Sequence, residues 1–385
     1  MVRWLESGEL EDLRISPGEN GLLTIAYDHS AVNDSSEFFL NLSLEGKEDW
    51  GILAAGHIYA REQLEISLPE RDYIPGAEAM ADIVFNDNGK QVIVSGQGFS
   101  LDFDKASGTI ISWKKDGVQL LEKGPVPDFW RPLTDNDYGN RLDKRAGVWK
   151  DAGSNAEVTA FDKEMLDDGS LLINVEMAIS DNEGNKLAAE TISYRIYGSG
   201  DILVDISFRK EDAALPELPR MGMQMHLKGR YDRLSWYGRG PHHNYADRKT
   251  SAFIGIWEGP VAAQYVPYIR PQENGYKTDT RWFSLTDDEG RGIMVRGNPT
   301  ICFAALHNLH EDFAAPGNLA RRRKDAAEVN THTTDIKPRD LVAVNIDYGQ
   351  MGVGGDNSWG ARPHPQYRLE ADSYSYSFIM RAVGD

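Results

Sequence analysis

The chain has 385 residues, enough for roughly two or three domains, and 41% of them are hydrophobic, as in a globular protein. It contains no run of roughly 18 apolar residues that would span a membrane, and its first residues lack the apolar segment of a signal peptide. The formal charge of −19 argues against nucleic acid or an anionic membrane as a partner, and a single cysteine, Cys302, excludes internal disulfides. These features leave the compartment, cytoplasmic or exported, open.

Residues 1–72 predict part of a β-sandwich. Apolar residues alternate with polar ones over residues 22–27, 38–44 and 63–68, and alternation at period 2 is typical of half-buried strands. So few strands do not close a sandwich, and strands facing an absent sheet would expose apolar surface. We therefore expect the chain to begin inside a domain.

A predicted linker over residues 73–90, which carries a Pro-Gly pair and an Asn-Asp-Asn-Gly turn, leads into a second domain over residues 91–385. In that domain strand signals return roughly every 8–12 residues, and turns rich in Asp, Asn and Gly separate them as hairpin loops would. The best helix candidate is 318–329, with a basic run at 321–324 that we expect to be solvated. No alternation of strands and helices occurs, which argues against a Rossmann unit or a TIM barrel.

The predicted strands of this domain lie at residues 91–95, 99–104, 109–113, 118–121, 170–179, 187–197, 201–208, 221–227, 234–237, 282–285, 292–295, 341–347 and 374–380. A two-sheet antiparallel sandwich is the natural way to bury so much alternating sequence. The predicted fold class is therefore all-β.

Four loop-like stretches, residues 128–140, 237–248, 265–281 and 350–365, are dense in side chains that bind polar ligands. Their candidate residues are Arg131, Asp135, Asn136 and Asp137 in the first, Arg239, His242, His243, Asn244 and Arg248 in the second, Arg270, Glu273 and Asn274 in the third, and Asp356, Asn357, Trp359 and His364 in the fourth. Aromatic rings beside such groups are typical of a carbohydrate site, because a sugar packs its apolar face on a ring and needs partners for its hydroxyls.

A structural interpretation stays open for these stretches, because long loops use Asp, Asn and Arg to satisfy their own buried backbone groups. In the second stretch the adjacent histidines, with Asp247 and Glu273, are an alternative acid–base set. In the fourth stretch Trp359 stands in a polar, Gly-rich loop with no local apolar pattern to bury it, so it needs a partner elsewhere.

The sequence predicts no metal site. His242 and His243 are adjacent, so on a strand they point to opposite faces and cannot share one metal, while His307 and His310 have ligand spacing but no third partner. Phosphate-loop, dinucleotide-binding and nucleophile-elbow patterns are absent. A retaining glycosidase needs two carboxylates, and the sequence alone selects no pair among its 60 acidic residues.

Residues 128–137, 237–248, 265–275 and 345–359 together resemble the C-terminal small chain domain of the β-galactosidases of glycoside hydrolase family 2. Residues 54–69 resemble the end of the immunoglobulin-like domain that precedes it in that family. The resemblance implies a partial immunoglobulin-like β-sandwich over 1–72 and a large antiparallel β-supersandwich, similar to galactose mutarotases, over 91–385.

The family hydrolyses terminal β-galactosides with two glutamates of a TIM barrel, and that barrel has no counterpart here. The resemblance therefore implies no catalytic residue and no cofactor in this chain, with Mg or Na bound only by the barrel. Its implied partners are a galactoside and the catalytic barrel, within a homo-oligomeric parent enzyme. Two alternatives remain, a separate carbohydrate-binding module and a mutarotase-like epimerase using His242 or His243 with Glu273 or Asp247.

In the family, the tryptophan of the matching Gly-Gly-Asp motif reaches into the barrel's active-site mouth and stacks on the sugar. The resemblance gives this role to Trp359, with Asp356, Asn357 and His364 as further substrate-binding candidates. We therefore expect Trp359 to be exposed at a loop tip. His243 is a departure, because the family usually has Glu at that position.

Overall fold

The computed structural model describes residues 3–10, 15–28, 30, 32, 36–67, 81–313, 330, 332–357 and 359–384. The chain divides into two compact units, Met1–Arg71 and Asp72–Asp385, and each is described by itself. The predicted helix over 318–329 and its basic run lie outside the described residues.

The described part of the first unit contains a two-stranded antiparallel sheet, β1 (Phe38–Glu45) and β2 (Ile58–Ser67). The prediction of a strand over 22–27 is wrong: these residues form no strand, and Leu22 is 99% exposed. Alternation alone does not make a strand, because its backbone also needs a neighbour to pair with. Large apolar side chains elsewhere in the described part of this unit are exposed too, among them Trp50.

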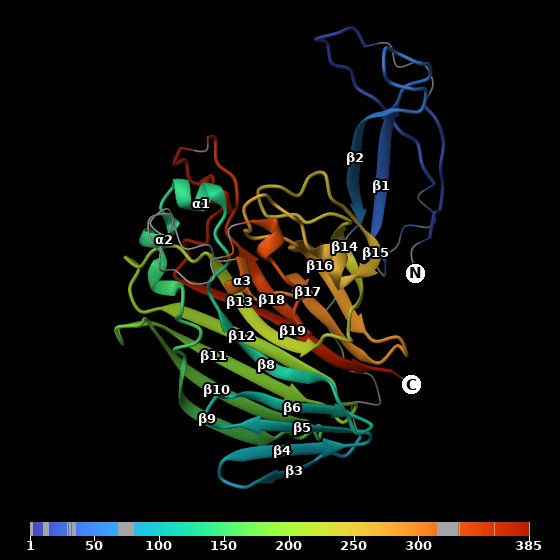
Figure 1. Ribbon diagram of the computed structural model, residues 1–385. Coiled ribbons are helices and arrows are strands. Elements are labelled where there is room, and N and C mark those ends of the chain that lie inside the picture. The colour runs from blue at the N-terminus through green and yellow to red at the C-terminus, as the bar shows by residue number, and fades with distance from the viewer. Residues whose placement is uncertain are drawn as a thin grey trace. The chain divides into compact units, whose positions relative to one another are not determined.

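The second unit is an all-β structure of two antiparallel sheets (Figure 1). The smaller sheet has five strands, paired in chain order: β3 (Val84–Asp87), β4 (Gln91–Gly96), β5 (Phe99–Asp104), β6 (Thr109–Lys115) and β7 (Val118–Gln119). Strand β3 lies inside the range predicted as linker, and it pairs with β4 through Val84↔Ser95 and Phe85↔Val94.

The larger sheet has 12 strands. They are β8 (Leu121–Asp128), β9 (Glu157–Met165), β10 (Leu171–Ser180), β11 (Lys186–Ile196), β12 (Ile202–Lys210), β13 (Arg220–Lys228), β14 (Arg233–Gly240), β15 (Phe253–Pro260), β16 (Lys277–Thr286), β17 (Gly292–Leu306), β18 (Leu341–Gln350) and β19 (Ser373–Val383). The main path runs β15-β14-β16-β17-β19-β12-β11-β10-β9, and β18, β13 and β8 branch from β17.

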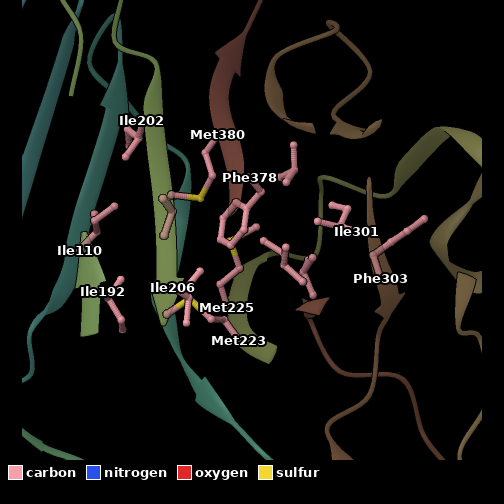
Figure 2. Close-up of a cluster of buried hydrophobic side chains, with 14 of the residues drawn as sticks. Ile110, Ile192, Ile202, Ile206, Met223, Met225, Ile301, Phe303, Phe378 and Met380 are labelled. Atoms are coloured by element: carbon pink, nitrogen blue, oxygen red, sulfur yellow. The ribbon is translucent and has the colours of Figure 1, made fainter. Parts of the chain in front are cut away.

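One hydrophobic core is shared by both sheets. Along β12 each second residue from Ile202 to Phe208 is buried, which is the period of a strand with one face on a core. Figure 2 shows side chains from several strands meeting in this core, among them Ile110 of β6, Ile192 of β11, Met223 of β13 and Phe378 of β19. The predicted large antiparallel β structure is confirmed.

Helices are short and lie in the connections: α1 (Asp135–Gly139), α2 (Leu142–Arg145), α3 (His310–Phe313), and the 3₁₀ turns η3 (Gly147–Trp149), η4 (Val261–Gln264), η6 (Thr333–Asp335) and η7 (Pro365–Tyr367). Helix α1 falls within a stretch expected to be a loop. It begins with a capping box, in which Thr134 and Asp137 each accept the other's backbone N–H at 3.0–3.1 Å. No helix in the described part of the chain is long and apolar enough to cross a membrane.

Candidate functional site

The fourth polar stretch, residues 350–365, begins at the last residue of β18 and is called the Trp359 loop. In Figure 1 it is the red segment close to α1. Trp359 is 87% exposed, so the expected exposure is confirmed. Its ring contributes nothing to the core of the second unit, and the exposed face is available to another molecule or domain.

Arg131 holds the first carbonyl groups of the Trp359 loop. Its side chain is fully buried and donates to the carbonyl oxygens of Met351, at 2.5 Å, and Gly352, at 3.0 Å. The guanidinium is itself fixed by Asp137, whose two carboxylate oxygens lie 3.0 and 3.1 Å from Nη2. A planar guanidinium suits this task because it offers several donors in one rigid plane.

Two further side chains form hydrogen bonds with the next backbone groups of the loop. Asn136 of α1 donates its amide to the carbonyl oxygen of Val353 at 3.1 Å. Asp247, from the second polar stretch, accepts the backbone N–H groups of Val353 at 3.1 Å and Gly354 at 2.7 Å. Sequence reasoning named Asp247 only as a possible acid–base group and missed this contact.

The tip of the loop is held by its own side chains. The Asn357 side-chain oxygen accepts the backbone N–H groups of Trp359 at 2.9 Å and Ala361 at 3.3 Å, an arrangement that fixes a turn. His364 Nε2 lies 2.8 Å from a carboxylate oxygen of Asp356, and both side chains are exposed. The predicted residues of this stretch are thus brought together around the exposed ring.

Arg270 of the third stretch connects to the other side of α1. It forms an ion pair with Asp135 at 3.0 Å, and its guanidinium lies over the ring of Tyr138 at 4.1 Å from the centroid. Asn274 serves the backbone of its own stretch: its side-chain oxygen accepts from Val266 N at 3.1 Å. These contacts join the first and third stretches, and they leave Ile269 between them 89% exposed.

Glu273 belongs to a buried charge cluster around Arg220 of β13, which sequence reasoning did not single out. Arg220 lies 3.0 Å from Asp128, 3.5 Å from Glu273 and 3.4 Å from Asp347. Burial lowers the pKa of Arg220, but the three carboxylates outweigh it and the net shift is upward. The adjoining pocket has a volume of ≈ 10 Å³, room for about one water molecule and too small for a sugar.

Gln350, the first residue of the Trp359 loop, links this cluster to the loop. Its amide nitrogen donates to Glu273 at 3.2 Å, and its oxygen accepts from Arg131 at 3.3 Å. All three side chains are buried. Glu273 therefore supports the base of the loop instead of facing a ligand.

The polar side chains of the second stretch are mostly committed to backbone groups. Arg239 pairs with Asp279 and donates to the carbonyl oxygen of Ala252 at 2.8 Å. Asn244 is fully buried and accepts both the backbone N–H and the hydroxyl of Thr278, at 2.9 and 2.6 Å. This geometry favours the structural interpretation over a second sugar site. The stretch's other arginine, Arg248, lies over the ring of its neighbour Tyr245.

His243 joins the second and third stretches as a neutral imidazole. Its Nδ1 accepts the N–H of Gly275 at 3.3 Å, and its Nε2 lies 3.0 Å from the hydroxyl of Tyr268. Burial, and then the positive charges of Arg248 and Lys277, lower the pKa of His243 to about 3. A neutral hydrogen-bonded ring thus stands where the family usually has a carboxylate.

His242 contacts the Ser251 hydroxyl at 3.1 Å, and burial lowers its pKa. In the described residues no hydrogen bond or ion pair joins His242 or His243 to Glu273 or Asp247, the residues of the acid–base alternative. Nor does any group of three or more His, Cys, Asp or Glu among them have an arrangement that would hold a metal.

The comparisons with known proteins agree with the four motifs. Residues 95–380 match the family described as "Beta galactosidase small chain", and residues 3–67 match "Beta-galactosidase, domain 4". The chain belongs to the β-galactosidase small chain family. It corresponds to a C-terminal region of larger β-galactosidases, which confirms the resemblance.

Similar proteins include a β-galactosidase of Priestia megaterium, 36% identical over 98% of this chain, and one of Streptococcus thermophilus, 29% identical over 96%. The chain spans only about a third of these relatives, 35% and 34% of their lengths. Among solved structures, a galactose 1-epimerase from Lactobacillus acidophilus NCFM has a TM-score of 0.45 at 8% identity, covering 79% of this chain and 98% of its own. A putative aldose 1-epimerase from Escherichia coli K12 has a TM-score of 0.41 at 12% identity, covering 79% of this chain and 100% of its own.

Proposed function

We propose that this chain is the non-catalytic C-terminal portion of a β-galactosidase, and that the Trp359 loop supplies a sugar-stacking surface at the mouth of an active site formed by the enzyme's catalytic barrel. The observation that carries the proposal is the exposed ring of Trp359 on a loop whose first carbonyl groups, and the N–H groups of Val353 and Gly354, are held by buried or half-buried side chains. A rigid, exposed aromatic face is what a sugar ring needs for stacking.

The pockets of the second unit support a non-catalytic role. Glycoside hydrolysis with retention uses two carboxyl groups roughly 5–5.5 Å apart on either side of the sugar. The pocket beside Arg220 is too small for a sugar, and a larger pocket of ≈ 410 Å³ is lined by a single carboxylate, Asp205. Neither of these two pockets in the described residues therefore offers the chemistry of a glycosidase.

Hydrolysis assays test the proposal. We expect no turnover of a chromogenic β-galactoside by the 385-residue chain alone. We expect turnover by a chimera in which this chain replaces the matching region of the Priestia megaterium β-galactosidase. In that chimera Trp359→Ala should weaken substrate binding by about 1–3 kcal/mol, the loss typical of an aromatic contact surface. Turnover by the isolated chain that is abolished by replacing one of its carboxylates, or an unchanged KM in Trp359→Ala, would contradict the proposal.

A carbohydrate-binding module is the second candidate, because Trp359 is already exposed in this chain. Calorimetric titration of the isolated chain with galactose and with lactose distinguishes the two. Millimolar binding that is lost in Trp359→Ala favours the module. Absence of binding by the chain, with a Trp359 effect in the chimera, favours a loop that works only beside the barrel.

A further inference from the structure

We propose that Asp247 is a positioning residue for Trp359: its carboxylate, together with Arg131, makes the Trp359 loop a preorganised arm instead of a mobile lid. This inference rests on the proposed function, since it assigns a residue that aims the stacking ring. Asp247 lies on a different polar stretch from Trp359, and the two are 112 positions apart in the printed sequence.

Every backbone N–H and C=O group at the base of the loop has a hydrogen-bond partner. The N–H of Met351 donates to Pro219 O at 3.1 Å, and that of Gly352 to Tyr367 O at 2.7 Å. The next two N–H groups, of Val353 and Gly354, donate to Asp247. With the carbonyls of residues 351–353 held by Arg131 and Asn136, the chain leaves β18 without a free backbone group before residue 354.

Asp247 is itself held in place. It lies in a tight turn closed by two backbone hydrogen bonds between Tyr245 and Arg248, at 3.2 and 2.8 Å. Tyr245 is 2% exposed and stacks on the ring of Tyr276, with centroids 5.6 Å apart. The carboxylate therefore projects from an anchored turn and does not need the loop to order it.

The carboxylate of Asp247 is committed to the loop. It forms no ion pair among the residues that the structure describes, and its hydrogen bonds go to the two loop amides. Hydrogen bonds from amides to a charged carboxylate are about twice as strong as neutral ones. Glycines at the facing positions allow the approach, because a Cβ on Gly352 or Gly354 would lie only 2.6 or 3.1 Å from Asp247 Oδ2.

The tip of the loop depends on this base. Beyond residue 354 Asn357 and the exposed His364–Asp356 pair fix the tip within the loop. The returning part of the loop is anchored on the rest of the unit by Arg362, which pairs with the buried Glu217 at 2.9 Å. Ordering a loop during binding costs affinity, and a prepositioned loop avoids that cost. Loss of the Asp247 contacts should therefore weaken sugar binding through the position of Trp359.

A double-mutant cycle in the chimera tests this inference. We expect Asp247→Ala to lower kcat/KM for lactose roughly three- to tenfold, mainly through KM, the scale of ordering one or two side chains. In a Trp359→Ala background the same replacement should have little further effect, because Asp247 acts through that ring. Asp247→Asn keeps the shape and serves as a second variant if the alanine protein does not fold.

Asp181→Asn is the matched control, because Asp181 also accepts two backbone N–H groups, those of Glu183 and Asn185 at 2.9 Å, but in the β10–β11 turn. It should leave KM unchanged. Additive effects of Asp247→Ala and Trp359→Ala, or no effect of Asp247→Ala and Asp247→Asn where Trp359→Ala has one, would overturn the inference alone. An unchanged kcat/KM in Trp359→Ala would instead overturn the proposed function and the inference with it.

Discussion

Arg131 and Asp137 form an ion pair at 3.0 Å in which the two side chains are 0% and 1% exposed. The two residues are six positions apart in the sequence, yet the terminal nitrogens of Arg131 also donate to residues 350–352, near the far end of the sequence. A local pair thus fixes a distant loop.

Breaking this pair should be costly. Arg131→Met leaves the Asp137 carboxylate buried without its cation and frees two loop carbonyls, so we expect a loss of about 3–5 kcal/mol in the free energy of unfolding. Urea denaturation followed by fluorescence measures it. The exposed pair of Arg233 and Asp288 is the control, because Arg233→Met should cost no more than about 1 kcal/mol. Equal losses in the two variants would contradict the assignment of Arg131 as an anchor.

Strands that run along the core could be predicted from local sequence. The predicted ranges 187–197 and 201–208 correspond to β11 and β12, because each has one face on the core and so alternates apolar and polar residues. The range 341–347 corresponds to β18, in which residues 342–347 are all buried. Alternation predicted a strand over 22–27, where none forms among the described residues. Composition predicted a linker over 73–90, but β3 forms at 84–87 in this turn-rich segment.

The candidate site was predictable only in part. The exposure of Trp359 was expected from the family resemblance, whereas the lack of a local apolar pattern indicated only that the ring needs a partner elsewhere. The contacts that fix its loop could not be predicted, since Arg131 lies 220 residues from Met351 and Asp247 lies 106 residues from Val353. A sequence pattern carries no information on such distant partners, and the buried Arg220 cluster was missed for the same reason.

Glu190 of β11 should make stability fall toward alkaline pH. It is 1% exposed, and burial raises its pKa from 4.5 to about 8. The folded chain keeps a proton that the unfolded chain releases above pH 4.5, so this contribution to stability is full below pH 4.5 and is lost as the pH rises to about 8. Glu190→Gln retains the uncharged shape and should remove that decline. Urea midpoints across this range measure it, with the exposed Glu176→Gln as control. Parallel profiles of wild type and Glu190→Gln would refute the prediction.

His243 should make the stability of the fold fall toward acid pH. Its pKa falls from 6.5 to about 3 on folding, so its contribution is full above pH 6.5 and is lost as the pH falls toward 3, where the unfolded chain binds the extra proton. His243→Gln can keep the contacts with Gly275 and Tyr268 without titrating. We expect a shallower loss of stability between pH 6.5 and 4 in the variant, measured by chemical denaturation.

The loss of stability at acid pH should not vanish in His243→Gln, because burial also lowers the pKa of His226 to about 4. The exposed His332 provides the control, and His332→Gln should follow the wild-type profile. If His243→Gln has the same acid-side slope as the wild type, the neutral, buried imidazole described for His243 is not what sets the slope.

Gly352 tests how closely the Trp359 loop fits its anchor. A Cβ at this position would lie 2.6 Å from Asp247 Oδ2, closer than real Cβ atoms approach, and 3.1 Å from Pro363 Cβ, which is tighter than most real contacts. Gly352→Ala must push the loop away from Asp247, so we expect a loss of about 1–3 kcal/mol in stability, the usual cost of overpacking. Gly349→Ala, near the end of β18, is the control, because a Cβ there meets nothing within 4 Å.

The Gly352 effect should depend on Asp247. If the carboxylate is the obstacle, Asp247→Ala removes most of the clash, and Gly352→Ala should cost less in that background than in the wild type. Denaturation of the four proteins gives the coupling free energy, and KM for lactose in the chimera should follow the same order. A Gly352→Ala cost that is the same with and without the Asp247 carboxylate would mean that the added Cβ clashes mainly with Pro363, its other close neighbour.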